Sequence, residues 1–220
     1  MIETLFPSEV GTLAATPEMW NGTLLPEEEA CLSPRAVEKR RREFTAGRVC
    51  ARAALARFGI RDFPLRSGPD RAPIWPPGMV GSLSHCRDYC GVAVARLGTV
   101  AGVGLDVEAD QALDESIVRR VCTLTERARF AGLPGAAARW AIVVFCAKES
   151  VYKCHHPLAG TFLDFDDVEV GLDPDAGRFV AAIHRARGPN GEPTVPVVRT
   201  LSGRFARHGG YVFAGVTLGA

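Results

Sequence analysis

Apolar and polar residues follow a helical period in some segments of the chain and a strand period in others, and turn-forming residues separate these segments. Ser33 and Pro34 open a predicted helix to about 58, because serine caps helices, proline suits their first turn and Gly59 follows the end. A shorter helix starts at 26–29, and the proline- and glycine-rich segment 61–79 is a predicted loop. The pattern then predicts strands at 80–85, 89–96 and 100–108, helices at 114–131 and 136–154, and strands at 167–172, 178–184, 194–206 and 211–218.

The order of these elements is helices followed by strands, and it occurs twice. Strands come in adjacent groups and do not alternate singly with helices, which favours an α+β fold over a doubly wound parallel sheet. The two halves are similar in content, and the border between them falls near residue 105. The pattern therefore predicts an internally duplicated fold with an N-terminal half at 1–104 and a C-terminal half at 105–220.

Composition narrows the class of protein. The 220 residues include 26 basic and 25 acidic residues, a net charge of +1, so no basic field of the kind used to coat nucleic acid is present. The longest apolar run, 140–147, is far shorter than the ~20 residues of a membrane span, and no signal peptide is visible. Seven cysteines without a CxxC pair favour free thiols and a reducing cytoplasm.

The first candidate for chemistry is the strand end 102–108, with the sequence Gly-Val-Gly-Leu-Asp-Val-Glu. Asp106 and Glu108 are two residues apart, so they share one face of the strand while Leu105 and Val107 point into the core. Adjacent carboxylates repel unless a cation lies between them, which suggests a site for a divalent metal. A solvated strand end explains the pair equally well.

The second candidate is the helical segment 145–153. Glu149 and Lys153 are four residues apart and face one way, with Phe145 a turn earlier. An exposed ion pair is the ordinary interpretation, but the preceding run is apolar and the chain contains only three lysines against 23 arginines. A lysine in such a chain suggests proton transfer or a single phosphate contact, which arginine cannot replace. Lys148 lies about 100° around the helix, on a different face.

Two further patterns carry possible anion contacts. Ser84 and His85 end a predicted strand, where they suit either a phosphate contact or a structural role; no GxSxG or GxxxxGK[ST] motif is present. One face of the first long helix repeats every four residues with Arg40, Phe44, Arg48 and Arg52. This stripe suits a nucleic acid, one small polyanion or a solvated face, and the near-neutral chain favours the small polyanion over a duplex.

Taken in order, the motifs resemble those of the 4′-phosphopantetheinyl transferases of the surfactin- and enterobactin-synthetase type. They are the basic helix with Gly47-Arg48, Gly-Ser-Leu-Ser-His, Gly-x-Asp-x-Glu and Phe-x-x-Lys-Glu-Ser-x-x-Lys, and they run from about 35 to 167. The resemblance implies a pseudo-dimer of two similar α+β halves. It also implies transfer of phosphopantetheine from coenzyme A to a serine of an apo carrier protein, with release of adenosine 3′,5′-bisphosphate.

The resemblance also implies roles for individual residues. It assigns Mg²⁺ to Asp106, Glu108 and Glu149, and coenzyme A to Arg40, Arg48, Arg71, Ala72, Pro73, Ser84, His85, Asp106 and Lys153. Glu149 would take the serine proton, ahead of a bound water, and Lys153 would stabilise the leaving phosphate. Phe145 stands where many members have Trp. The implied partners are acyl or peptidyl carrier proteins of polyketide and nonribosomal peptide synthesis, with no nucleic acid and no membrane, and we expect a cytoplasmic monomer.

Two other functions remain open from the residues alone. The first is a nucleotide- or RNA-binding module without turnover, which would use the basic stripe but has no need for three converging carboxylates. The second is another metal-dependent enzyme that cleaves a nucleotide diphosphate and passes the group to water.

Overall fold

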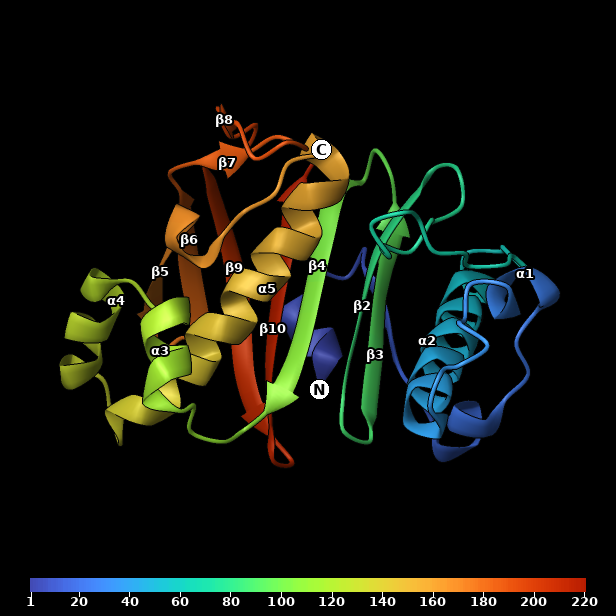
Figure 1. Cartoon of the computed structure of the whole chain (residues 1–220), viewed down its shortest axis with the longest axis horizontal. Helices are drawn as coiled ribbons and strands as arrows, with labels where there is room; N and C mark the ends of the chain where they lie inside the picture. Colours follow the sequence, from blue (N-terminus) through green and yellow to red (C-terminus); the bar gives the residue numbers. More distant parts are fainter.

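The computed structural model describes residues 1–220 as two antiparallel sheets side by side, each covered by one long helix (Figure 1). The first sheet has the order β1-β3-β2 and carries α2 (Glu38–Ala56); the second has the order β4-β10-β9-β6-β5 and carries α5 (Trp140–Ala159). The strands are β1 (Gly11–Ala14), β2 (Met79–Cys86), β3 (Tyr89–Arg96), β4 (Val100–Ala109), β5 (Val168–Asp173), β6 (Arg178–Ile183), β9 (Thr200–His208) and β10 (Tyr211–Gly219). This arrangement confirms the predicted α+β class.

Short elements connect these layers. They are η1 (Ile2–Leu5), η2 (Pro17–Asn21), α1 (Pro26–Glu29), α3 (Glu115–Val121), α4 (Leu124–Arg129), η3 (Phe130–Gly132), η4 (Ala137–Arg139), η5 (Phe165–Asp167), β7 (Ala186–Arg187) and β8 (Pro193–Thr194). None of the helices combines the length and the apolar character that crossing a membrane requires.

Three helix boundaries differ from the sequence prediction. Helix α2 begins at Glu38 and not after Ser33, because the Ser33 hydroxyl accepts a hydrogen bond from Arg35 in a local turn. The predicted helix 114–131 is two helices, because Thr123 caps the second one: its hydroxyl accepts from the Glu126 N–H, and the Glu126 carboxylate accepts from the Thr123 N–H. Helix α5 includes Pro157 in its last turn and ends at Ala159, not at 154.

Strand β4 belongs to the second sheet although it follows β3 in the chain. It pairs with β10 from end to end, so that Asp106 stands opposite Ala214 and Glu108 opposite Val212. The predicted border at residue 105 therefore lies inside a continuous strand. We propose that the halves divide at the turn 97–99, which precedes β4.

The two sheets meet where β2 lies beside β4, and serine side chains bridge them. The Ser82 hydroxyl accepts a hydrogen bond from the Leu105 N–H at 2.9 Å, and the Ser84 hydroxyl accepts from the Val107 N–H at 3.3 Å. These hydroxyls satisfy backbone groups of β4 that have no strand partner on this side. Serine at both positions thus joins the two halves.

Helix α5 lies directly against β4, and the two glycines of the 102–108 motif permit this approach. A Cβ atom at Gly104 would overlap the carbonyl oxygen of Ser150, and one at Gly102 would lie 2.9 Å from Cδ1 of Leu158. On the opposite face of β4, Leu105 and Val107 are fully buried in the core between the sheets, as the alternation predicted.

One buried histidine predicts acid sensitivity of the fold. His155 on α5 is fully buried, and neither ring nitrogen has a hydrogen-bond partner. Burial, with a smaller contribution from His156, lowers the pKa of His155 below the ordinary value of 6.5. As the pH falls below about 6.5, His155 becomes protonated in the unfolded chain but stays neutral in the folded chain. The free energy of unfolding therefore decreases as the pH falls.

We therefore expect His155→Leu to reduce the loss of melting temperature between neutral and mildly acidic pH. Thermal unfolding across this pH range measures the slope, and His208→Gln, at an exposed position, serves as the control with an unchanged slope. A His155→Leu variant with the same pH dependence as the parent chain would contradict the assignment.

Candidate active site

A cavity of about 520 Å³ lies between the two halves. Its walls come from α2, the loop before β2, the end of β2, the end of β4 and one face of α5. Every residue to which the family resemblance assigns a role lines it: Arg40, Arg48, Arg71, Ala72, Pro73, Ser84, His85, Asp106, Glu108, Glu149 and Lys153. The fold thus brings together segments that are up to 113 residues apart in the chain, from Arg40 to Lys153.

Asp106 forms the centre of the polar network in this cavity. It is 2% exposed, and its Oδ1 accepts hydrogen bonds from Lys153 Nζ at 2.6 Å and from the Ser84 hydroxyl at 2.9 Å. Lys153 also donates to the Ser84 oxygen at 3.1 Å. Lys153 therefore pairs with Asp106 across the helix–strand interface, and not with Glu149 on its own helix.

Two more carboxylates face this network. Burial, and then repulsion from Asp106, raise the pKa of Glu108 to about 7. The same two causes, in the same order, raise the pKa of Glu149. For Lys153, burial opposes the charged form, but Asp106 and then Glu149 outweigh it and raise the pKa of the ammonium group. The Lys153 ammonium group therefore keeps its charge, while Glu108 and Glu149 take up protons more readily than exposed glutamates do.

The carboxylates are chemically suited to bind a divalent cation. In this structure, however, no three of them are close enough together to coordinate one ion. Asp106 Oδ2 is buried and has no hydrogen-bond partner, although a buried carboxylate oxygen ordinarily requires one. Asp106 and the two glutamates, whose pKa values are raised by burial and then by the charge of Asp106, supply the hard oxygen donors that Mg²⁺ prefers. A bound cation would satisfy the free oxygen and relieve the repulsion.

The opposite end of the cavity is basic, and the contacts of Arg48 hold its walls together. Arg48 is buried; it donates to the Leu65 carbonyl at 3.0 Å and to the Ser67 hydroxyl at 2.7 Å, and its guanidinium lies 3.9 Å from the centre of the Phe44 ring. Burial lowers the pKa of Arg48 to about 10. These contacts fix the loop that carries Arg71, whose φ of 68° lies in the left-handed region.

His85 lies between the basic and acidic ends. Its Nε2 is 3.4 Å from Nη1 of Arg40, and its Nδ1 is 3.9 Å from the Glu43 carboxylate. Burial lowers the pKa of His85, Glu43 opposes this, and Arg40 adds to the lowering. Ser84 points the other way, into the Asp106 network, so the two adjacent residues serve different parts of the cavity.

Comparisons with known proteins bear on this geometry. One family model, described as 4′-phosphopantetheinyl transferase N-terminal domain, matches residues 27–95, and the 4′-phosphopantetheinyl transferase superfamily model matches 102–194. The chain is 45% identical to 4′-phosphopantetheinyl transferase Svp of Streptomyces mobaraensis over 83% of this chain and 76% of Svp. It is 35% identical to 4′-phosphopantetheinyl transferase PptT of Mycobacterium tuberculosis over 99% of this chain and 98% of PptT.

The chain belongs to the 4′-phosphopantetheinyl transferases. It is also 35% identical to enterobactin synthase component D of Salmonella typhi, over 54% of this chain and 49% of that protein. The predicted function is confirmed: the chain transfers 4′-phosphopantetheine from coenzyme A to a serine of a carrier protein. No comparison supports a binding module without turnover.

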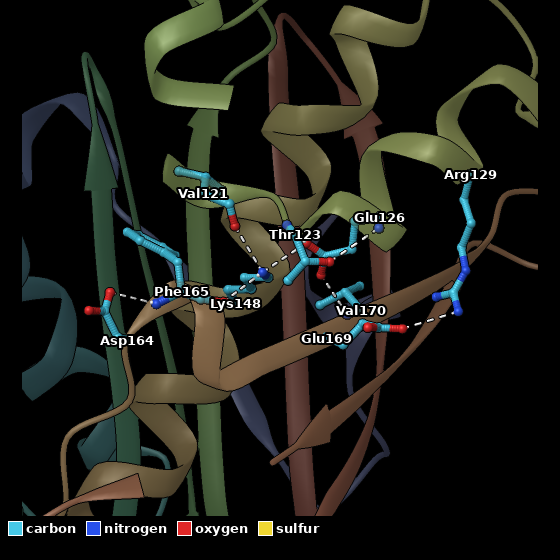
Figure 2. Close-up of polar contacts among 9 residues, drawn as sticks. All are labelled: Val121, Thr123, Glu126, Arg129, Lys148, Asp164, Phe165, Glu169 and Val170. Atoms are coloured by element: carbon cyan, nitrogen blue, oxygen red, sulfur yellow. Dashed lines mark hydrogen bonds and ion pairs between the residues drawn. The ribbon is translucent and has the colours of Figure 1, made fainter. Parts of the chain in front are cut away.

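Two basic residues of this transferase have structural roles that the sequence did not reveal. Lys148 is not a surface charge: its side chain is 2% exposed, and Nζ donates to Val121 O, Glu126 Oε2 and Phe165 O (Figure 2). Arg52 continues the stripe on α2 but lies outside the cavity and pairs with the buried Glu28. A helix buried on most sides has no free face, so its polar residues must find partners inside.

The cavity also contains residues that the sequence analysis missed. His156 on α5 lies 3.6 Å from Asp70 in the loop before β2, which joins the two sides of the cavity. The signal was present, because Tyr152 and His156 lie three and seven residues after Glu149, on the same helical face. Trp75 also lines the cavity and packs where a side chain at Gly81 would be, which explains the first glycine of the 81–85 motif.

The network predicts opposite effects of removing two neighbouring carboxylates in the metal-free protein. Repulsion alone predicts that loss of Asp106 maintains or raises stability, but Asp106 is the acceptor for Lys153 and Ser84. We expect Asp106→Ala to cost about 1–3 kcal/mol, because buried donors lose their partner. Glu108→Gln should maintain or raise the melting temperature above pH 7, because it removes a charge that the fold disfavours.

Thermal unfolding of both variants in chelator, above pH 7, measures these effects. An Asp106→Ala variant as stable as the parent chain, or a Glu108→Gln variant less stable than Asp106→Ala, would contradict the described network.

Proposed function

We propose that the transfer requires Mg²⁺ and that Asp106, Glu108 and Glu149 would hold it. The observation that carries this proposal is the buried, partnerless Oδ2 of Asp106 beside two carboxylates of raised pKa. Bound there, the ion would neutralise negative charge on the diphosphate of coenzyme A. Magnesium takes few protein carboxylates together with substrate phosphates, so two or three of these side chains suffice.

We infer that the basic end of the cavity holds the nucleotide of coenzyme A. Arg40, Arg71 and His85 line that end with side chains able to donate to phosphate, and Arg48 keeps the loop 65–73 in place. Ala72 and Pro73 supply a small apolar wall for the adenine. Ser84 donates to Asp106, so we assign it to positioning that carboxylate and not to direct phosphate contact.

We propose the following chemistry at the acidic end, where Glu149 and Lys153 of α5 line the cavity. The carrier serine Oγ attacks the phosphorus that bears the pantetheine arm, and the bond from that phosphorus to the bridging oxygen breaks. Adenosine 3′,5′-bisphosphate leaves with the bridging oxygen, and the serine proton passes to a carboxylate oxygen of Glu149. The raised pKa of Glu149 suits a general base, because it brings proton affinity closer to the working pH.

Lys153 would act on the departing phosphate. Its ammonium group is held by Asp106 and Ser84, and its raised pKa keeps it charged before the reaction. A compact ammonium can donate one hydrogen bond to the leaving oxygen while the other two stay with the protein. Because one chain supplies both ends of the cavity, we propose that the transferase acts as a monomer, on acyl or peptidyl carriers.

The metal requirement has a direct test. Incubation of an apo carrier protein with this chain, coenzyme A and Mg²⁺ should add the mass of one phosphopantetheine to the carrier, read by mass spectrometry. Chelation of the metal should abolish the mass gain, and added Mg²⁺ should restore it. Transfer at the same rate in chelator would overturn the metal proposal, although the transferase assignment would stand.

The role of Lys153 is tested by Lys153→Arg. Guanidinium keeps the charge, but its planar fork is too broad for the contact that the ammonium group makes with Asp106 and Ser84. We expect kcat to fall by roughly 10²–10³, as for the loss of one hydrogen-bond donor to the charge that develops on the leaving group, with a smaller change in KM for coenzyme A. Lys39→Arg is the matched control, since the Lys39 side chain is 79% exposed. Wild-type kcat in Lys153→Arg would reduce Lys153 to a generic cation.

A further inference from the structure

Each half of the molecule contains one fully buried glutamate with the same kind of partners. Glu28 is the third residue of α1, and Glu126 is the third residue of α4. Both are 1% exposed or less. In each case the carboxylate joins its own short helix to the long helix of that half and to a backbone N–H further along the chain.

In the first half, the two oxygens of Glu28 have separate partners. Oε2 accepts from the Leu25 N–H at 3.0 Å and pairs with the guanidinium of Arg52 on α2. Oε1 accepts from the Leu65 N–H at 3.1 Å. Glu28 therefore joins α1, α2 and the start of the loop that carries Arg71.

In the second half, Glu126 repeats this pattern atom for atom (Figure 2). Oε2 accepts from the Thr123 N–H at 2.7 Å and from Nζ of Lys148 on α5 at 2.9 Å. Oε1 accepts from the Val170 N–H of β5 at 2.6 Å. Lys148 uses its two remaining protons on the carbonyls of Val121 and Phe165, both at 2.8 Å. All the donors and acceptors of this buried group are satisfied.

A buried ion pair adds little net stability, because the loss of hydration offsets the attraction between the charges. Its geometry is nevertheless demanding, because any shift of either helix leaves a buried charge without its partner. A buried ion pair that adds little net stability but fixes two helices relative to each other is suited to positioning the side chains on those helices. Its repetition in both halves, on the helix that carries site residues in each, indicates a shared purpose.

The side chains that each pair holds lie at different ends of the cavity. Arg52 is one helical turn after Arg48, and Leu65, which Glu28 binds through its N–H, accepts the Arg48 side chain through its carbonyl. Lys148 directly precedes Glu149 on α5 and lies five residues before Lys153. The first pair thus fixes the basic end of the cavity, and the second fixes the acidic end.

We propose that Glu28–Arg52 and Glu126–Lys148 are positioning pairs of the transferase with separable effects: the first sets the affinity for coenzyme A, and the second sets the rate of the chemical step. This proposal rests on the proposed assignment of the two ends of the cavity. Neither pair touches the substrate; each acts through the side chains on its long helix.

The test removes both charges of a pair together, because a single change leaves a buried charge unpaired and strongly destabilises the fold. The double variants are E28Q/R52M and E126Q/K148M. The chain offers a more exposed ion pair beside each buried one: Arg41–Glu29 joins α2 to α1, as Glu28–Arg52 does, and Arg129–Glu169 joins α4 to β5, as the bond from the Val170 N–H to Glu126 does. R41Q and R129Q are therefore the controls.

Steady-state transfer to one carrier protein is measured well below the lowest melting temperature of the set. We expect E28Q/R52M to raise KM for coenzyme A about tenfold or more with kcat within about threefold. We expect E126Q/K148M to lower kcat about tenfold or more with KM within about threefold. Both controls should retain wild-type constants.

Either double variant with both constants unchanged would show that its pair serves stability alone and would overturn the proposal. An equal change of both constants in both variants would overturn the separation. Asp106→Ala, measured in the same series, distinguishes these outcomes from an error in the site assignment. If this variant transfers at the wild-type rate, the proposed site is wrong, independently of the results for the two pairs.

Discussion

The close approach of α5 to β4 is the constraint on which the rest of the molecule depends. Gly104 leaves no side chain between the strand and the Ser150 carbonyl, so helix and strand lie backbone to backbone. At that distance, Lys153, one helical turn after Ser150, reaches Asp106, two residues after Gly104 on the strand. Lys153 can then bond Asp106 directly. A larger residue at 104 would push α5 outward and separate the acidic end of the cavity from its cation.

The junction of the two halves and the active site share one side chain. Ser84 accepts from the Val107 N–H, which ties β2 to β4, and the same hydroxyl donates to Asp106 and accepts from Lys153. A backbone ladder between β2 and β4 would have closed one continuous sheet. The serine bridges hold the strands together and leave the cavity open at their ends. One serine thus contributes both to the junction between the two sheets and to the geometry of the site.

Much of this architecture could be predicted from short-range patterns. The alternation at 105–108 predicts which side chains of β4 face the core, and the four-residue spacing of Glu149 and Lys153 predicts their common face, because both depend only on the geometry of one element. The site roles of these residues remain predictions from family resemblance. The start of α2 was missed because Ser33 and Pro34 suit a turn as well as a helix cap.

Other features depend on contacts between distant segments and leave little trace in the sequence. The scarcity of lysine singled out Lys148 and Lys153 together, but it could not tell a buried structural cation from one in the cavity. That distinction comes from Glu126, which is 22 residues away and reaches Lys148 only because Thr123 interrupts the predicted helix. Similarly, the glycines at 102 and 104 form a clear sequence pattern. Their role in admitting α5 close to β4 can be recognised only once the helix that packs on them is known.

The distribution of charge along the cavity favours one kind of ligand over its rivals. A simple polyanion would be attracted by Arg40 and Arg71 at one end and repelled by Asp106, Glu108 and Glu149 at the other, where one ammonium faces three carboxylates. Coulomb energies at the effective dielectric near a protein surface are a few kcal/mol per close pair, so this repulsion would govern binding. A ligand with an anionic nucleotide, a diphosphate that arrives with a divalent cation and a neutral arm beyond it matches both ends. Coenzyme A has these three parts in that order.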